Sequence, residues 1–214
     1  MPDPVQRAIG LVLLVLTGPL LIALAIAVRL ETRGPALFRA SRMGPGGHPF
    51  ECLKLRTMRA NRSDQGPGVT SGSDSRITRI GGLLRRFRLD ELPQLWNVVR
   101  GQMRLVGPRP EDPRYVDFDL PYHSEVFTAR PGIAGLTQLV YADEGKLLEG
   151  TADPDAHYRQ TILPGKVAID AAYLRHRSTK LDLWILAQTP RAMLGRPIHL
   201  PAEVQATIED PSDA

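Results

Sequence analysis

Cysteine is almost absent from this 214-residue sequence, which contains only Cys52. A single cysteine cannot form an intrachain disulfide and fits a reducing compartment. Cysteine and histidine nowhere fall at the spacing of zinc ligands, so a structural zinc is not expected. Internal repeats are also lacking, and Pro164-Gly165-Lys166 has neither the upstream glycine nor the following serine or threonine of a phosphate-binding loop. The length suits one domain with a hydrophobic core, or one domain and an appendage.

Acidic residues are few in the middle of the chain, although the overall net charge is only +4. Asp90 and Glu91 are surrounded there by seven arginines: Arg76, Arg79, Arg85, Arg86, Arg88, Arg100 and Arg104. Such a concentration of positive charge predicts an anionic partner, namely nucleic acid, a phosphorylated metabolite or anionic lipid. A solvated arginine face is the alternative.

A run of 21 uncharged residues extends over 8–28. At ~1.5 Å per residue, a straight helix of this length would cross a hydrocarbon core of ~30 Å. Gly18 and Pro19 interrupt its middle, and because proline removes a backbone hydrogen bond, we expect a kink there. Thr17 is a candidate partner for the backbone carbonyl that the kink leaves free.

Basic residues flank this run, with Arg7 before it and Arg29 and Arg33 after it. A kinked, re-entrant hairpin with both ends on the cytoplasmic side satisfies the kink and the flanking charges together. The alternatives are a straight membrane span, a signal peptide cleaved near Ala25-Ile26-Ala27 and a buried core helix.

A β-hairpin is predicted between Pro35 and Met58, with strands over 36–39 and 50–56 and turn residues over 44–49. Because side chains alternate along a strand, Lys54 and Arg56 are expected on one face. The following segment, 61–75, is rich in Gly, Ser, Asp and Pro and predicts a long loop that acts either as a lid or as a linker.

The acid pair Asp90-Glu91 precedes apolar residues at helical spacing, of which Trp96 is the largest. Pro93 is tolerated only in the first turn of a helix, and Gly101 is a natural stop, so the helix is expected to begin near Asp90. The positive end of a helix keeps an aspartate ionised, as a nucleophile requires. The same position also suits a helix cap, and local pattern alone favours the cap.

The second half of the chain carries several weaker signals. Asp117-Phe118-Asp119 and Asp153-Pro154-Asp155 match the short D-x-D pattern of many nucleotide-sugar glycosyltransferases. The two glycines of the segment 130–138 allow a close backbone approach. Helices are expected over 167–176, which contains Asp170, and over 181–194.

Each of these motifs is weak alone, but their combination and order along the chain are specific for one family. The chain resembles the bacterial sugar transferases known as monotopic phosphoglycosyl transferases over about residues 5–195. The matching pieces are the apolar segment with its central proline, Gly34-Pro35-Ala36-Leu37-Phe38, Lys54-Leu55-Arg56-Thr57-Met58, Leu84-Arg85 through Leu95, Val106-Gly107-Pro108-Arg109-Pro110, Arg130-Pro131-Gly132-Ile133 with Gly135-Leu136, and Asp170 with Ser178 and Leu181-Asp182.

The resemblance implies a mixed α/β fold that is mainly helical with a short β-hairpin. It implies a membrane-inserted re-entrant helix over 1–33, a cytosolic catalytic domain over 34–195 and a flexible tail over 196–214. Family members lie on the cytoplasmic face of the bacterial inner membrane, in contact with its lipid. They transfer a phosphosugar from a UDP-sugar to a polyprenyl phosphate, usually undecaprenyl phosphate, and release UMP, with no nucleic acid partner. A homodimer is a reasonable further expectation.

By position in the family motifs, Asp90 is the expected nucleophile, which forms a covalent phosphosugar intermediate, and Glu91 is the expected Mg²⁺ ligand. Lys54 falls with them at the catalytic centre. The residues implied to bind substrate are Arg56, Arg85, Arg109, Arg130 and Asp170.

Three departures from the family pattern bear on substrate choice. Gly10 stands where many members have an acidic residue, and Gly101-Gln102-Met103-Arg104 replaces Gly-Asp-Met-Ser. Val140-Tyr141-Ala142-Asp143-Glu144 replaces Asn-Gly-Arg-Asn, so an arginine expected near Ala142 is missing. The sequence does not name the sugar or the pathway that uses it.

Two other classes of function compete with this one. In the first, the chain is a membrane-bound scaffold that binds anionic lipid, and the acid pair only caps a helix. In the second, it is a glycosyltransferase of another fold that uses Asp117 and Asp119.

Overall fold

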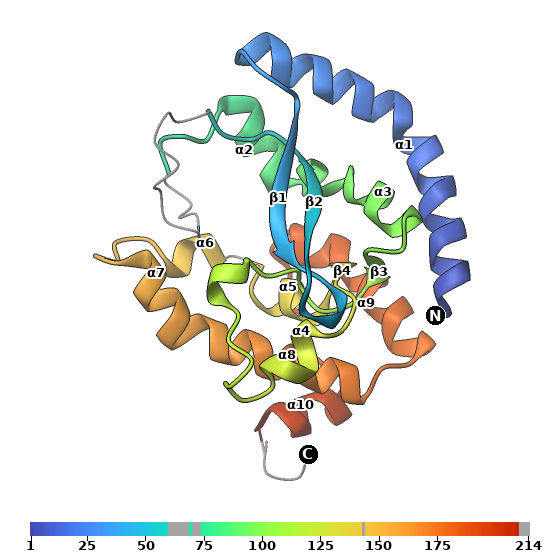
Figure 1. Ribbon diagram of the computed structural model, residues 1–214, viewed down its shortest axis with the longest axis vertical. Helices are drawn as coiled ribbons and strands as arrows, with labels where there is room; N and C mark the ends of the chain where they lie inside the picture. The colour runs from blue at the N-terminus through green and yellow to red at the C-terminus, as the bar shows by residue number, and fades with distance from the viewer. Residues whose placement is uncertain (60–68, 70–73, 143, 210–214) are drawn as a thin grey trace.

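The computed structural model describes residues 1–59, 69, 74–142 and 144–209. Over these residues the fold is mainly helical, with one antiparallel hairpin and one parallel strand pair (Figure 1). The strands are β1 (Leu37–Met43), β2 (Pro49–Leu55), β3 (Arg104–Val106) and β4 (Gly132–Ala134). The helices are α1 (Asp3–Glu31), α2 (Arg79–Arg86), α3 (Gln94–Val99), α4 (His123–Phe127), α5 (Leu136–Val140), α6 (Glu144–Leu147), α7 (Pro154–His157), α8 (Leu163–Arg175), α9 (Thr179–Met193) and α10 (Ala202–Glu209).

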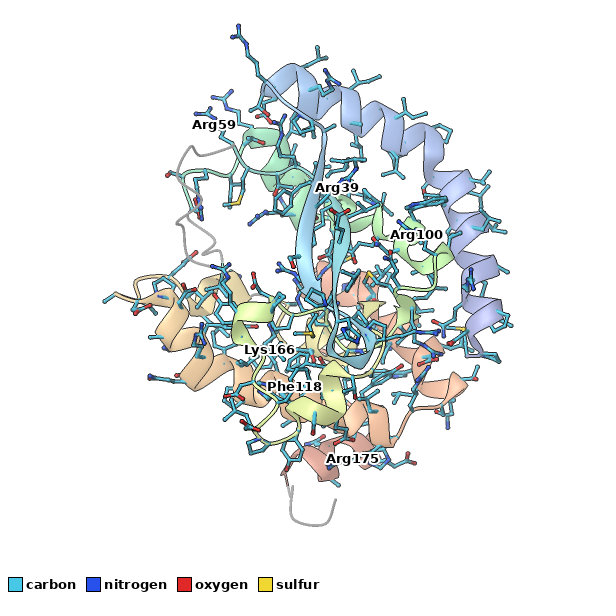
Figure 2. All side chains as sticks on the ribbon, in the orientation of Figure 1. Arg39, Arg59, Arg100, Phe118, Lys166 and Arg175 are labelled. Carbon is cyan, nitrogen blue, oxygen red and sulfur yellow. The ribbon has the colours of Figure 1, made fainter. Side chains whose placement is uncertain are left out.

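Helix α1 is 29 residues long and runs continuously through Pro19. It bends along its length (Figure 1), and many of its side chains point away from the rest of the molecule (Figure 2). Length and composition alone would let it cross a membrane, and only 6% of its most apolar window is buried. Val15 and Leu16, near its middle, are among the most exposed large apolar side chains. A surface of this kind needs a partner other than water.

The prediction for Thr17 is wrong. Its hydroxyl donates to the Leu13 carbonyl at 2.7 Å. The carbonyl deprived of its N–H donor by Pro19 belongs to Val15, four residues before the proline. Thr17 therefore bonds one turn along its own helix and does not compensate the proline.

Gly10 lets α1 pack closely against α3. A Cβ atom added at Gly10 would lie 3.0 Å from Val98 Cγ1. Since Val98 is fully buried, a larger side chain here would have to displace the core of α3. The departure from the family pattern at Gly10 is thus a packing feature of the contact between the two helices.

The predicted hairpin is confirmed, with a longer first strand than expected. Leu37 pairs with Leu55 and Met43 with Pro49. Asn97 on α3 fastens this hairpin, because its side chain accepts from Leu53 N–H at 3.0 Å and donates to the Glu51 carbonyl at 2.7 Å. The hairpin and α3 are therefore held as one unit, and β2 lies against the turn that carries the acid pair.

The remaining helices cover a parallel strand pair that the sequence did not predict. Arg104 of β3 pairs with Gly132 of β4. A Cβ atom at Gly132 would lie 2.1 Å from Gly107 N, so the predicted close approach is between two segments of the protein's own backbone. The predicted helices are confirmed as α8 and α9, and Ser178 caps α9 by accepting from Leu181 N–H.

Two predictions concern the rest of the chain. In the predicted tail, 196–214, the described part includes helix α10, whose Val204 is 1% exposed and belongs to the hydrophobic core. Helix α10 thus packs against the core at Val204, and the flexibility expected of the tail stays a prediction. Most of the predicted loop, 61–75, lies outside the described residues, so the choice between lid and linker stays a prediction.

Candidate active site

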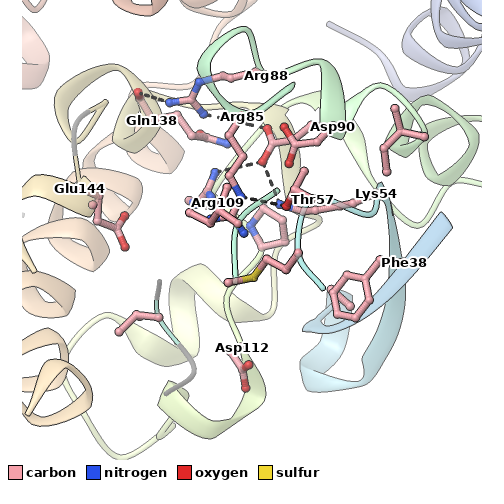
Figure 3. Close-up of a pocket in the computed structure, with 18 of the residues that line it drawn as sticks. Phe38, Lys54, Thr57, Arg85, Arg88, Asp90, Arg109, Asp112, Gln138 and Glu144 are labelled. Atoms are coloured by element: carbon pink, nitrogen blue, oxygen red, sulfur yellow. Dashed lines mark hydrogen bonds and ion pairs between the residues drawn. The ribbon is translucent and has the colours of Figure 1, made fainter. Parts of the chain in front are cut away.

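A cavity of about 1410 Å³ opens between the hairpin, the turn after α2 and the segments from Arg109 to α8. Figure 3 shows the side chains that line it. Besides Arg56, which borders the cavity, five of the predicted site residues meet there: Lys54, Arg85, Asp90, Glu91 and Arg109. They come from β2, from α2 and the turn that follows it, and from the loop after β3, so only the tertiary fold assembles them.

The acid pair lies in a 3₁₀ turn, Leu89–Glu91, that precedes α3. The α-helix itself begins at Gln94, four residues later than expected, after Pro93. Neither the 3₁₀ turn nor α3 has a capping hydrogen bond from the side chain at its N-cap position. Asp90 and Glu91 are nevertheless buried, each 8% exposed. Two adjacent carboxylates are thus buried without standing at an N-cap position. Because burial of a charged group is costly, this arrangement weakens the interpretation that they serve only as helix caps.

Glu91 is surrounded by cations. Its Oε1 accepts from Lys54 Nζ at 2.9 Å and lies 3.7 Å from Arg109 Nη1, while Oε2 lies 4.0 Å from Arg88 Nη1. Burial alone would raise the pKa of Glu91, but Lys54, Arg109 and Arg88 together lower it to about 2. Glu91 is therefore ionised at neutral pH.

Asp90 differs from its neighbour because the structure shows no hydrogen bond or ion pair between its carboxylate and another described side chain. Burial raises the pKa of Asp90, and the charge of Glu91 raises it further, while Lys54 and Arg85 lower it. Asp90 lines the cavity. An unpaired, partly desolvated carboxylate that faces a cavity can attack an electrophile placed there.

Arg85 and Arg88 frame the acid pair from the side of α2. Arg85 Nε donates to the Thr57 hydroxyl at 2.9 Å, and the pKa of its guanidinium is lowered chiefly by burial. Arg88 Nη2 donates to the Gln138 carbonyl at 3.2 Å. Arg88 was not predicted as a site residue, although it belongs to the arginine cluster noted in the sequence. Its φ of 50° is unusual for a non-glycine residue, and such strain often accompanies a functional constraint.

Arg109 is placed by Asp170. The Asp170 carboxylate accepts from Arg109 N–H at 3.0 Å and from the Thr137 hydroxyl. Asp170 is 4% exposed and is not among the cavity-lining residues, so it orients the Arg109 segment from behind. Burial raises the pKa of Asp170 to about 6, although both hydrogen bonds oppose the shift.

Two other predicted substrate-binding residues have structural partners. Arg56 borders the cavity, but its guanidinium donates to the carbonyls of Arg33 and Thr32 at 2.7 and 2.8 Å, just beyond the end of α1. Arg130 forms an ion pair with Asp3 at the start of α1 and does not line the large cavity. The structure therefore does not bring Arg130 to the acid pair.

The wall opposite the acid pair contains four residues that sequence reasoning missed: Glu111, Glu144, Tyr158 and Lys166. Lys166 is 3% exposed, and its Nζ lies 3.0 Å from Glu144 Oε2 and 2.6 Å from the Tyr158 hydroxyl. Glu111 accepts from the same hydroxyl. No local pattern identified this network, because its members come from separate segments. The available signal was Lys166, the one charged residue in the stretch 160–169.

The D-x-D segments have local structural roles. Asp117 accepts from Asp119 N–H, and Asp153 caps α7 by accepting from Ala156 N–H. Neither segment lines the cavity. The hypothesis of a glycosyltransferase that uses Asp117 and Asp119 is not supported by this arrangement.

The acid pair could hold Mg²⁺ only if substrate phosphates and water supply the remaining ligands. Among the residues that the structure describes, no group of three or more Asp, Glu, His or Cys side chains is arranged to hold a metal ion. Mg²⁺ is commonly held by one or two carboxylates together with substrate phosphates and water. Asp90 and Glu91 meet this smaller requirement.

Comparison with known proteins identifies the class. The sequence model of the family described as "Bacterial sugar transferase" matches residues 4–196. The chain belongs to the bacterial sugar transferase family.

Individual relatives carry more specific names. The chain is 41% identical over 184 residues to the UDP-glucose:undecaprenyl-phosphate glucose-1-phosphate transferase of Caulobacter vibrioides, covering 84% of this chain and 64% of that one. It is 37% identical over 182 residues to the UDP-N-acetylgalactosamine-undecaprenyl-phosphate N-acetylgalactosaminephosphotransferase of Aeromonas hydrophila, covering 84% and 40%. It is 34% identical over 191 residues to exopolysaccharide production protein PSS of Rhizobium leguminosarum bv. phaseoli, covering 86% and 90%. The chain thus spans less than two thirds of the length of the first two.

Proposed function

We propose that the protein transfers a phosphosugar from a UDP-sugar to undecaprenyl phosphate. The observation that carries this proposal is the contrast within the acid pair, where Glu91 is neutralised by cations and Asp90 is left unpaired in the cavity. Two relatives are named for transfer from a UDP-sugar to undecaprenyl phosphate. Catalysis of phosphoryl transfer consists largely of positioning and charge stabilisation, which a cationic cavity supplies.

The chemistry balances with Asp90 as nucleophile. An Asp90 carboxylate oxygen attacks the sugar-bearing phosphorus, a new P–O bond forms, and the P–O bond to UMP breaks. The lipid phosphate then attacks the same phosphorus, and the bond to Asp90 breaks. The product is a polyprenyl diphosphate sugar, and Asp90 is regenerated.

The cations have separate tasks in this scheme. Lys54 and Arg109 hold Glu91 ionised and keep positive charge beside the diphosphate. Arg85 and Arg88 bring further guanidinium groups to the same end of the cavity, where UMP would leave with its charge. When bound, Mg²⁺ would neutralise the diphosphate; Glu91 and Asp90 are the residues that would hold it.

The proposal includes a re-entrant membrane helix. Near the start of α1, Arg7 Nε donates to the Val99 carbonyl at 2.9 Å, and the buried Gln6 accepts from Leu105 N–H. At its other end, Glu31 accepts from Arg79 N–H at 2.8 Å. Because both ends contact the same catalytic body, placement of both on the cytoplasmic side agrees with the contacts better than a straight span does. Labelling of a cysteine introduced near the N-terminus from the periplasmic side would overturn this topology.

Intact-mass analysis tests the reaction. Incubation with a UDP-sugar alone should release UMP and add one phosphosugar to the wild-type chain. Asp90→Asn should form no adduct and lower turnover by about 10³-fold or more, since loss of a nucleophile removes the covalent route. Asp119→Asn, outside the cavity, is the matched control and should keep full activity. Full turnover by Asp90→Asn would contradict the proposal.

A further inference from the structure

The large cavity has two chemically different ends. One end carries the cations around the acid pair, and the other is bordered by Glu144, Glu111 and Tyr158. Ligand pockets usually measure about 300–1,000 Å³. A cavity of about 1410 Å³ therefore has room for a group attached to the diphosphate as well as for the diphosphate itself.

Arg109 separates the two ends. Figure 3 shows Asp90 and Glu144 on opposite sides of Arg109. Although burial opposes it, the charges of Glu91, Glu144 and Glu111 together raise the pKa of the Arg109 guanidinium. A ligand whose phosphates meet Arg109 can thus extend in the other direction toward Glu144.

The buried Lys166 holds the Glu144 side chain in place. Its Oε2 pairs with Lys166 Nζ at 3.0 Å, and Lys166 is fixed in turn by the Tyr158 hydroxyl at 2.6 Å. The side chain of Glu144 is 24% exposed and that of Lys166 only 4%. Within the described part of the chain, the structure gives Glu144 Oε1 no hydrogen-bond partner. An oriented carboxylate oxygen is therefore available to the cavity.

We infer that Glu144 binds hydroxyl groups of the transferred sugar and favours neutral sugars over those that carry a carboxylate. This inference rests on the proposed function, because it concerns the same cavity. A carboxylate accepts hydrogen bonds from hydroxyl donors, and these charge-assisted bonds are among the stronger ones in proteins. Glu144 and Glu111 share one lysine, Lys166, so their group keeps a net negative charge, and the carboxylate of a uronic acid would be repelled there.

The test compares Glu144→Gln and Glu144→Ala with the wild-type chain in nanodiscs. Binding of a neutral UDP-hexose, of UDP-glucuronate and of UDP alone is measured by calorimetry in chains that also carry Asp90→Asn, which prevents adduct formation, and UMP release is measured in parallel with Asp90 present. Glu51→Gln is the control, because Glu51 is well exposed on the hairpin and does not line the cavity. Melting temperatures confirm that each variant is folded.

Glu144→Gln should weaken binding of the neutral UDP-hexose about tenfold, and Glu144→Ala more, since a hydrogen bond to a charged group is worth about 1.5–3 kcal/mol. Binding of UDP should change less than twofold, and the preference for the neutral sugar over UDP-glucuronate should fall. Equal weakening of UDP and UDP-hexose would assign Glu144 to the nucleotide and overturn the inference, as would unchanged binding of all three.

The binding assay separates this inference from the proposed function. If wild-type protein binds UDP-sugars but releases no UMP, the proposed reaction fails while the binding ratios still decide the role of Glu144. If wild-type protein releases UMP and the ratios do not move, only the inference about Glu144 fails. Absence of any UDP-sugar binding by the wild type would overturn both.

Discussion

Lys54 and Arg56 lie two residues apart near the end of β2, and both border the same cavity, yet they serve different regions of the molecule. Lys54 pairs with Glu91, the buried acid beside the proposed nucleophile. Arg56 turns its guanidinium toward the last carbonyls of the α1 region, at Thr32 and Arg33. The sequence places these bases on one face of a strand and cannot tell them apart.

The partners explain the difference. The end of a helix leaves backbone carbonyls without N–H donors and carries partial negative charge, both of which an arginine satisfies. A buried carboxylate requires a compensating cation, which Lys54 supplies together with Arg109. One base therefore sets the charge of the active site, and the other joins the end of α1 to the catalytic body.

The largest expected effect follows removal of the positive charge at Lys54. Lys54→Met should lower kcat/KM by about 10²–10³-fold, because a preorganised charge beside the diphosphate is lost. Steady-state UMP release, measured below the melting temperature of the variant, checks this. A lower melting temperature of Lys54→Met with unchanged kcat/KM would contradict this prediction, because Lys54 would then have the same structural role as Arg56.

Arg56→Met should act mainly on stability. Two charge-assisted hydrogen bonds to backbone carbonyls are lost, which predicts a decrease of about 3–5 kcal/mol in the free energy of unfolding. Denaturant titration in detergent measures this change. At a temperature where the variant is folded, kcat/KM should stay within about threefold of wild type; a fall as large as that of Lys54→Met would show that Arg56 contacts substrate.

Much of the fold could be predicted from periodicity and local chemistry. Helix α1 contains the continuous uncharged run 8–28, the hairpin has a Gly-Pro-rich turn, and α9 follows a serine cap. The parallel pair of β3 and β4 could not be predicted, because each strand has three residues and the pairing depends on distant backbone segments that meet at Gly132. Helix α10 was missed because its burial against the core is a tertiary contact.

The candidate site likewise contains residues that could be predicted from the sequence and residues that could not. Asp90, Glu91, Lys54, Arg85 and Arg109 were found through motifs, and the fold brings them together. Arg130 stands in an equally distinctive motif, but its partner is Asp3, 127 positions away. Glu144 and Lys166 belong to no motif, and their pairing arises only where α6 meets α8. Sequence patterns identify charged residues, whereas their roles depend on which charge the fold places opposite each.

Asp170 offers a smaller test of how Arg109 is positioned. Its folded-state pKa of about 6 exceeds the ordinary 3.8, so the folded state binds this proton more tightly than the unfolded chain does. The stabilisation is present below about pH 4 and is lost as the pH rises through about 6, a change worth about 3 kcal/mol. Asp170→Asn should remove it, so the melting temperature of the variant relative to wild type should rise between pH 4 and pH 8. Parallel pH curves for the two proteins would contradict this.

The smallest effect is expected at Arg130, at the opposite end of α1 from Arg56. Its side chain is 42% exposed, and Asp3 also pairs with Arg104, so the acid keeps a partner when Arg130 is replaced. Exposed ion pairs contribute only about 0–1 kcal/mol. Arg130→Gln should therefore shift the melting temperature by less than about 3 °C, with kcat/KM within about twofold of wild type. A tenfold loss of kcat/KM in a folded Arg130→Gln variant would require Arg130 to reach the substrate, and the structural role assigned to Arg56 in contrast to Lys54 could then not be extended to Arg130.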